Sequence, residues 1–248
     1  MFYQKLVFIN REEHANLKLD PITDYLFAAT ADSVPVAGVE FSELAREMPV
    51  VFAVSPDGSA MPVALMALRD GENLFVTESG AWDGRYVPAF IRRYPFALAD
   101  NGTGRYALCY DEAHTGFGTE AGEPLFKADG ELAERLAGTL DFLENVRVHF
   151  DETHEFTKWL VENQLLVPTD AKVTLRSNNQ EFRLAGFHVV DSEKFGQLSG
   201  EALESAFRKG FIGWVFAHYQ SLGNLDALGT RLSMRMEQDV KKAPPAVH

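Results

Sequence analysis

The residues of this chain best suited to binding chemistry gather in one segment, Trp82–Leu98. Its seventeen residues include five aromatic side chains, three arginines and two prolines. A guanidinium group presents a planar fork of donors that matches a carboxylate or a phosphate, and aromatic faces stack on planar or sugar-like groups. The segment therefore predicts an anion-and-ring pocket of modest size.

Five side chains of this segment are the expected ligand contacts: Trp82, Arg85, Tyr86, Arg92 and Arg93. Proline is tolerated at the first helical position, so Pro88 predicts the start of a short helix, which Pro95 ends. Arg85 and Arg92 then share a face. The alternative reading is that the arginines pair with the chain's own carboxylates while the aromatics fill a junction between sheet and helix. His14, a lone histidine after Arg11-Glu-Glu, is a further candidate contact.

Catalytic motifs are absent, so no catalytic residue, cofactor or metal ligand is predicted. The chain has no Gly-x-Ser-x-Gly elbow and no phosphate-binding loop. Cys109 lies in an apolar strand, where a thiol is inert packing. His149 and His154 are five residues apart, which turns the two rings about 140° from each other on a helix. A solvated acidic face explains that pair better than a metal site does.

Composition excludes several classes of protein. A net charge of -13 argues against nucleic acid as the main partner, because phosphate binding needs a basic face. One cysteine cannot form an internal disulfide. The longest apolar run, Phe211–Ala217, is far shorter than the roughly 20 residues of a membrane helix, and the N-terminal residues do not resemble a secretory signal. We therefore expect a soluble, cytoplasmic protein without a membrane span.

The pattern of elements predicts an α+β fold with a mainly antiparallel sheet built from hairpins. Five short runs are expected to pair in one sheet: Val50–Val54, Val63–Leu68, Leu74–Glu78, Phe96–Ala99 and Arg105–Tyr110. Asp-Gly between apolar runs is a strong hairpin signal. A further hairpin joins Val173–Arg176 to Glu181–Val190, and Tyr25–Ala29 is a short apolar piece near the N-terminus.

Two long helical patterns complete the fold. Apolar residues at three-four spacing predict a helix over Glu131–Leu165, either kinked or divided in two near Arg147 and Thr153. A last helix runs from Ser199 to about Leu222, and its aromatic residues form either the core or a homodimer interface. We expect a single domain over residues 1–236 and a mobile tail over residues 237–248.

Several motifs together resemble the bacterial SapC-like family over the full length. They are Asn10-Arg11-x-x-His14, Met48-Pro-Val-Val-Phe52, Trp82-x-Gly84-x-Tyr86-x-Pro88, Arg92-Arg-Tyr-Pro-Phe96, Phe182-Arg-Leu-x-Gly-Phe187-x-Val-Val-Asp191 and Tyr219-x-Ser-Leu-Gly223. The resemblance implies a link to a locus for a paracrystalline surface layer, and similar proteins are associated with outer-membrane nutrient uptake and with flavin-dependent halogenase-like genes. It does not imply the peptide-transport permease of the same name, and it implies no catalytic residues.

These observations favour a non-catalytic accessory protein. It would bind a small anionic or peptide-like ligand, or a partner protein, at Trp82–Arg93 in support of a surface-layer or nutrient-uptake system. One alternative is an enzyme acting on amino acids or peptides, with His14 or His149 and carboxylates that converge only in the fold. The other is a structural component of a surface layer.

Overall fold

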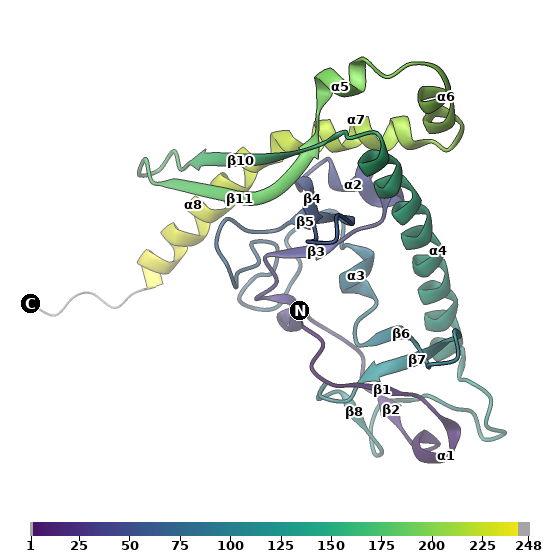
Figure 1. Ribbon diagram of the computed structural model, residues 1–248. Helices are drawn as coiled ribbons and strands as arrows, with labels where there is room; N and C mark the ends of the chain where they lie inside the picture. Colours follow the sequence, from purple (N-terminus) through teal and green to yellow (C-terminus); the bar gives the residue numbers. More distant parts are fainter. Residues whose placement is uncertain (1, 243–248) are drawn as a thin grey trace, which may run out of the picture.

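The computed structural model describes residues 2–242 and confirms the α+β class. Over these residues the strands form three antiparallel sheets, not the single sheet expected (Figure 1). The largest has the order β10 (Leu166–Thr174), β11 (Glu181–Val190), β4 (Val50–Val54), β5 (Ala60–Leu65), β3 (Ser33–Pro35). The second has the order β1 (Leu6–Phe8), β7 (Tyr106–Asp111), β6 (Phe96–Asp100). The third has the order β8 (Phe117–Gly118), β2 (Lys18–Leu19), β9 (Glu123–Pro124).

The strand expected at Leu74–Glu78 is wrong, and the chain between β5 and α3 forms no helix or extended strand. Leu74, Phe75 and Val76 are all buried, whereas a strand of a one-faced sheet buries alternate residues. The side chain of Asn73 makes the turn: its Oδ1 accepts the Phe75 N–H at 2.9 Å and its Nδ2 donates to the Ala28 carbonyl at 3.0 Å. Without a strand at this point, the β4–β5 and β6–β7 hairpins lie in different sheets.

The helices follow the apolar patterns with shifted limits. Their bounds are α1 (Arg11–His14), α2 (Phe41–Leu44), α3 (Ala89–Arg92), α4 (Glu134–Glu162), α5 (Ser192–Gly196), α6 (Gly200–Arg208), α7 (Phe211–Ser221) and α8 (Leu225–Lys242). Short 3-10 helices are η1 (Leu26–Ala28), η2 (Gly38–Glu40) and η3 (Leu222–Asn224). No helix among residues 2–242 is long and apolar enough to cross a membrane.

The expected helices differ from the observed ones in three places. The long middle helix is a single element, α4, with no division near Arg147 or Thr153. The expected helix from Ser199 is two helices, because Gly210 takes a left-handed conformation (φ 77°) between α6 and α7. The first part of the expected tail belongs to α8, and residues 243–248 lie outside the described residues.

Helix α4 joins two hydrophobic cores. Near its C-terminal end, Phe156 and Leu160 pack in the large core with Phe52 of β4 and Val215 of α7. Near its N-terminal end, its residues pack in a second core with the β1–β7–β6 sheet and β2. The buried members are Leu136, Leu143, Phe96, Tyr110, Leu19, Leu125 and Phe126. Figure 1 shows α4 descending from α7 to the β6–β7 hairpin. The middle of α4 therefore lies where the two cores meet.

A buried histidine fastens α7 to the large sheet. His218 is fully buried, its Nδ1 lies 2.8 Å from the Val50 carbonyl oxygen, and its Nε2 accepts the Val190 N–H at 3.1 Å. In the described register, β4 and β11 share only the pair His188–Phe52. The imidazole thus bonds main-chain groups where these strands separate. Burial lowers the pKa of His218 to about 4, so the ring is neutral and carries its proton on Nδ1.

We expect this histidine to make the fold sensitive to acid. Because its pKa is lower in the folded chain than its ordinary 6.5, the unfolded chain binds the proton first as the pH falls. The stability from the neutral ring is complete above about pH 6.5 and declines toward pH 4, by about 2 kcal/mol between pH 8 and pH 5. Denaturant titrations at both pH values measure this change.

The matched variants are His218→Gln and, at an exposed position, His154→Gln. His218→Gln should remove about 2 kcal/mol of the pH dependence, while His154→Gln should leave it as in the parent chain. Equal pH dependence in the parent and His218→Gln would contradict this role.

Candidate functional site

A cavity of about 270 Å³ opens beside the middle of α4, where η2 and α3 approach it. Much of its lining is apolar, and its polar groups come from three different elements. The lining residues are Ala37, Val39, Glu40, Tyr86, Ala89, Arg92, Phe142, Asn145, Val146 and His149. Two of the predicted contacts, Tyr86 and Arg92, are among them.

Glu40 is the buried carboxylate that assembles this cavity. Only 4% of Glu40 is exposed. Its Oε1 accepts the Tyr86 hydroxyl at 2.9 Å and the Ala89 N–H at 2.7 Å, and its Oε2 accepts the Ala37 N–H at 2.8 Å. A buried charge is tolerated when hydrogen bonds surround it. Glu40 therefore ties η2 to the first residue of α3.

Helix α4 and α7 hold η2 in place. The Gly38 N–H donates to Thr153 Oγ1 of α4 at 2.8 Å. On the other side, a Cβ at Gly38 would lie 2.4 Å from the ring of Trp214, so only glycine permits this approach of main chain to indole. These contacts fix the position of Glu40.

Tyr86 and Arg92 form the polar wall of the cavity. Burial, followed by the negative charge of Glu40, raises the pKa of Tyr86 to about 12, although Arg92 opposes the shift. The phenol therefore stays protonated, donates to Glu40 and accepts from the Arg92 guanidinium at 3.1 Å. Arg92 Nε donates to the Val87 carbonyl at 2.9 Å. The Arg92 guanidinium also lies 5.5 Å from the Tyr86 ring centroid and 5.1 Å from that of Phe142.

A second carboxylate, Glu47, holds the same segment by its main chain. Its side chain is 10% exposed. It accepts the Arg85 N–H at 2.9 Å and the Tyr86 N–H at 2.8 Å. Trp82 closes the turn, since its indole N–H donates to the Tyr86 carbonyl at 3.0 Å and its ring stacks on Phe75 at 5.7 Å. Trp82 thus packs internally and does not line the cavity.

The other predicted contacts lie outside the cavity. Arg85 has an exposed side chain. The Arg93 guanidinium lies over Phe90, 3.8 Å from the ring centroid, and over Tyr3 at 5.5 Å. His14 is buried in the N-terminal part of the chain, with Nδ1 3.1 Å from the Asn10 carbonyl oxygen and its ring edge-on to Tyr110. The structure thus brings Tyr86 and Arg92 together and separates them from His14.

No arginine of Trp82–Leu98 forms an ion pair with a described carboxylate. The neighbouring acid Glu40 bonds to N–H and O–H groups instead. Glu47 bonds to main-chain N–H groups of the segment, and it forms an ion pair with Arg231 of α8, at 4.0 Å. Within residues 2–242, no cluster of three or more histidine, cysteine or acidic side chains could hold a metal ion. The cavity therefore offers a guanidinium group and rings, with the His149 imidazole, bonded to Glu152 at 3.2 Å, at its side.

Sequence reasoning did not identify Glu40 or Phe142 as site residues. Glu40 is one of many carboxylates in an acidic chain, and nothing near it in the sequence reveals the three donors that it meets. Phe142 lies beside the apolar stripe of α4, next to the buried Leu143. The only sequence signal for Phe142 as a site residue was its aromatic side chain just outside the apolar stripe of the helix.

We expect Glu40→Gln to destabilise the fold by about 2 kcal/mol. An amide has one acceptor oxygen, whereas both carboxylate oxygens of Glu40 accept from buried donors. Either orientation of the amide sets its NH₂ group against an N–H or O–H donor. Urea titration measures the loss. The control Glu43→Gln affects only a surface pair with Arg46 and should cost less than about 0.5 kcal/mol; equal effects would contradict the role of Glu40.

A family model described as SapC matches residues 9–228, which include every residue of the cavity. No curated protein matches the chain, and neither does any solved structure. The match spans most of the 248 residues and agrees with the motifs that carry the resemblance in the sequence. This chain belongs to the SapC family.

Proposed function

We propose that this SapC-family chain is a non-catalytic binding protein for a small carboxylate with an apolar body. A carboxylic acid with an aromatic or branched side chain fits this description, as does the C-terminal residue of a peptide. The observation that carries the proposal is Arg92, which lines the cavity beside apolar side chains and forms no ion pair with a carboxylate of the described residues.

The donors of Arg92 define where the carboxylate binds. Its Nε and one terminal nitrogen bond to the Val87 carbonyl and the Tyr86 hydroxyl. These bonds fix the plane of the guanidinium group, and its other terminal nitrogen remains available. A carboxylate there would gain charge-assisted hydrogen bonds. Glu40 would not compete with the ligand carboxylate for the Arg92 guanidinium group, because the Glu40 oxygens already accept three hydrogen bonds.

The apolar body would lie against Phe142 and Val146 of α4. The cavity of about 270 Å³ is slightly smaller than typical ligand sites, which span roughly 300–1,000 Å³. It is suited to a ligand of amino-acid size. We further propose that such binding serves a surface-layer or nutrient-uptake system, the role that the resemblance implies.

Calorimetry with phenylacetate and its uncharged analogue phenylacetamide tests the proposal. Phenylacetate should bind with a Kd of about 1 mM, typical of so small a ligand. Phenylacetamide should bind at least roughly tenfold more weakly, because it lacks the charge that pairs with Arg92. Equal binding of the two compounds, or no saturable binding of phenylacetate, would contradict the proposal.

Arg92→Met and Arg85→Met form the matched pair of variants. Both remove one guanidinium group from the same segment, but only Arg92 lines the cavity. Arg92→Met should reduce phenylacetate affinity roughly tenfold or more, which corresponds to about 1.4 kcal/mol, whereas Arg85→Met should bind as the parent does. If only Arg85→Met reduced the affinity for phenylacetate, the ligand would bind near Arg85, outside the cavity, which would contradict the proposal.

A further inference from the structure

Strand β10 is an edge of the five-stranded sheet, and part of its main chain on the outer side lacks a partner. The Leu175 N–H donates to the Gln180 carbonyl, and the Asp191 N–H donates to the Leu165 carbonyl, each at 2.8 Å. Bonded and non-bonded residues alternate along an antiparallel ladder. The even-numbered residues between them, Lys172 and Thr174, therefore direct their N–H and C=O groups away from β11. No loop or side chain in the described residues bonds to these groups.

Pro168 follows the same alternation. It is an even-numbered residue of β10, opposite His188, so its missing N–H falls on the outer side, where a ladder bond is not lost. The bulge between Thr169 and Ala171 follows directly. Both features protect the first half of the edge from pairing. The second half, around Lys172 and Thr174, has neither.

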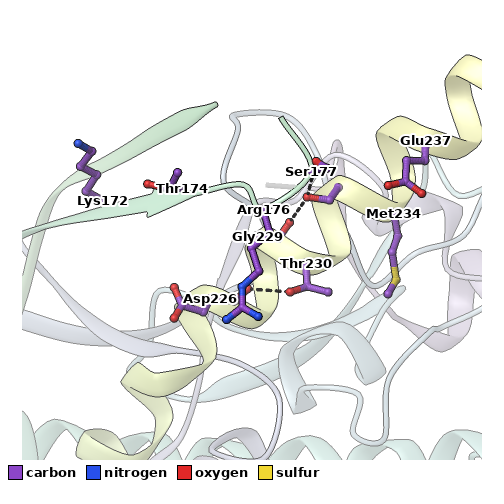
Figure 2. A pocket seen from close by; sticks show the side chains of 10 residues that line it. Lys172, Thr174, Arg176, Ser177, Asp226, Gly229, Thr230, Met234 and Glu237 are labelled. Carbon is purple, nitrogen blue, oxygen red and sulfur yellow. Dashed lines mark hydrogen bonds between the residues drawn. The ribbon is translucent and has the colours of Figure 1, made fainter. Parts of the chain in front are cut away.

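Helix α8 forms a wall beside this open half of the edge. A groove of about 630 Å³ lies between them, and its lining residues are Lys172, Thr174, Arg176, Ser177, Asp226, Gly229, Thr230, Ser233, Met234 and Glu237 (Figure 2). Gly229 allows the close approach, since a Cβ there would lie 2.8 Å from Val173 Cγ1. Ser177 Oγ donates to Ser233 Oγ at 3.2 Å and connects the end of the strand to the helix. A free strand edge beside a helix is the geometry in which proteins bind extended peptides by strand addition.

We propose that this groove binds an extended peptide segment, with one acidic residue opposite Arg176, as an additional strand beside β10. The peptide main chain would bond to the N–H and C=O groups of Lys172 and Thr174. Lys172 already forms an ion pair with Glu181 of β11, and the groove is also lined by two acids of α8, Asp226 and Glu237. Arg176 has no ion pair with a described carboxylate. Because cross-strand neighbours on one face interact, an acidic peptide residue opposite Arg176 would supply its partner.

The helical wall favours a single peptide strand over a second copy of this chain. If the β10 strands of two copies paired antiparallel around a twofold axis, the two sheets would join into one. Both α8 helices would then lie on the same face of that sheet, beside the two paired β10 strands. The groove already has α8 as one wall, and a second α8 would compete for this space. A single extended segment brings no helix with it.

Selection of peptides from a random ten-residue library displayed on phage, against the full chain, tests the proposal. The enriched peptides should carry an acidic residue at the position that lies opposite Arg176. Their affinity should fall roughly tenfold or more for Thr174→Pro, which removes an outward N–H as Pro168 does and leaves the β11 ladder in place. The control Thr174→Ala keeps the N–H and should bind as the parent does.

A change on the peptide side tests the same bonds without altering the protein. Two N-methylated forms of an enriched peptide are compared, one methylated at its odd-numbered residues and one at its even-numbered residues. One form should lose binding and the other should keep it, because only one of the two sets of amides faces β10. The proposal is overturned if no peptide is enriched, if Thr174→Pro binds the enriched peptides as the parent does, or if both methylated forms bind equally. Dimerisation of the chain that Thr174→Pro reverses would assign the edge to a second copy.

Discussion

Buried carboxylates that bind main-chain groups determine the chemistry of the central segment. Glu40 and Glu47 accept bonds from the N–H groups of Arg85, Tyr86 and Ala89. Within the described residues, the oxygens of Glu40 accept only from neutral N–H and O–H donors, whereas Glu47 also lies 4.0 Å from the guanidinium group of Arg231. Neither acid forms an ion pair with Arg92, although the net charge of the chain is -13.

The position of the cavity follows from the way α4 connects the two cores. Its two ends are fixed by apolar packing, in the large core and beside the three-stranded sheet. The middle of the helix contributes Phe142, Val146 and His149 to the cavity. Because both ends are anchored, this wall is rigid, and a ligand would meet a site whose geometry is already formed. Such preorganisation reduces the entropic cost of binding.

The groove beside β10 is a different kind of site. The family match ends at residue 228, whereas much of the helical wall, from Gly229 to Glu237, lies after it. The cavity near Arg92 therefore lies within the matched residues, and the groove lies partly beyond them. The two proposed sites together would let one protein connect a small ligand to a peptide partner.

The sequence predicted the elements better than their assembly. Apolar spacing predicted α4, because that pattern is long and local. The second strand of the β10–β11 hairpin was predicted with its observed bounds, but the first was expected only over Val173–Arg176, whereas β10 begins at Leu166. The strand at Leu74–Glu78 failed because Asn73 makes a buried turn, a contact with Ala28 that spacing does not encode. The segment Trp82–Leu98 was singled out for its arginines and rings, and two of its predicted contacts, Tyr86 and Arg92, line the cavity. Which arginine faces a cavity depends on Glu40, Glu47 and Phe142, which are distant in sequence and meet the segment only in the fold.

The most direct measurement of the central claim is an NMR titration of the arginine side chains in ¹⁵N-labelled protein with phenylacetate. We expect the chemical shift of the Arg92 Nε–H signal to change saturably with phenylacetate concentration, while the Arg85 and Arg93 signals do not move. A shift confined to Arg85 or Arg93, or an Arg92 signal that is unchanged while phenylacetate binds, would contradict this claim.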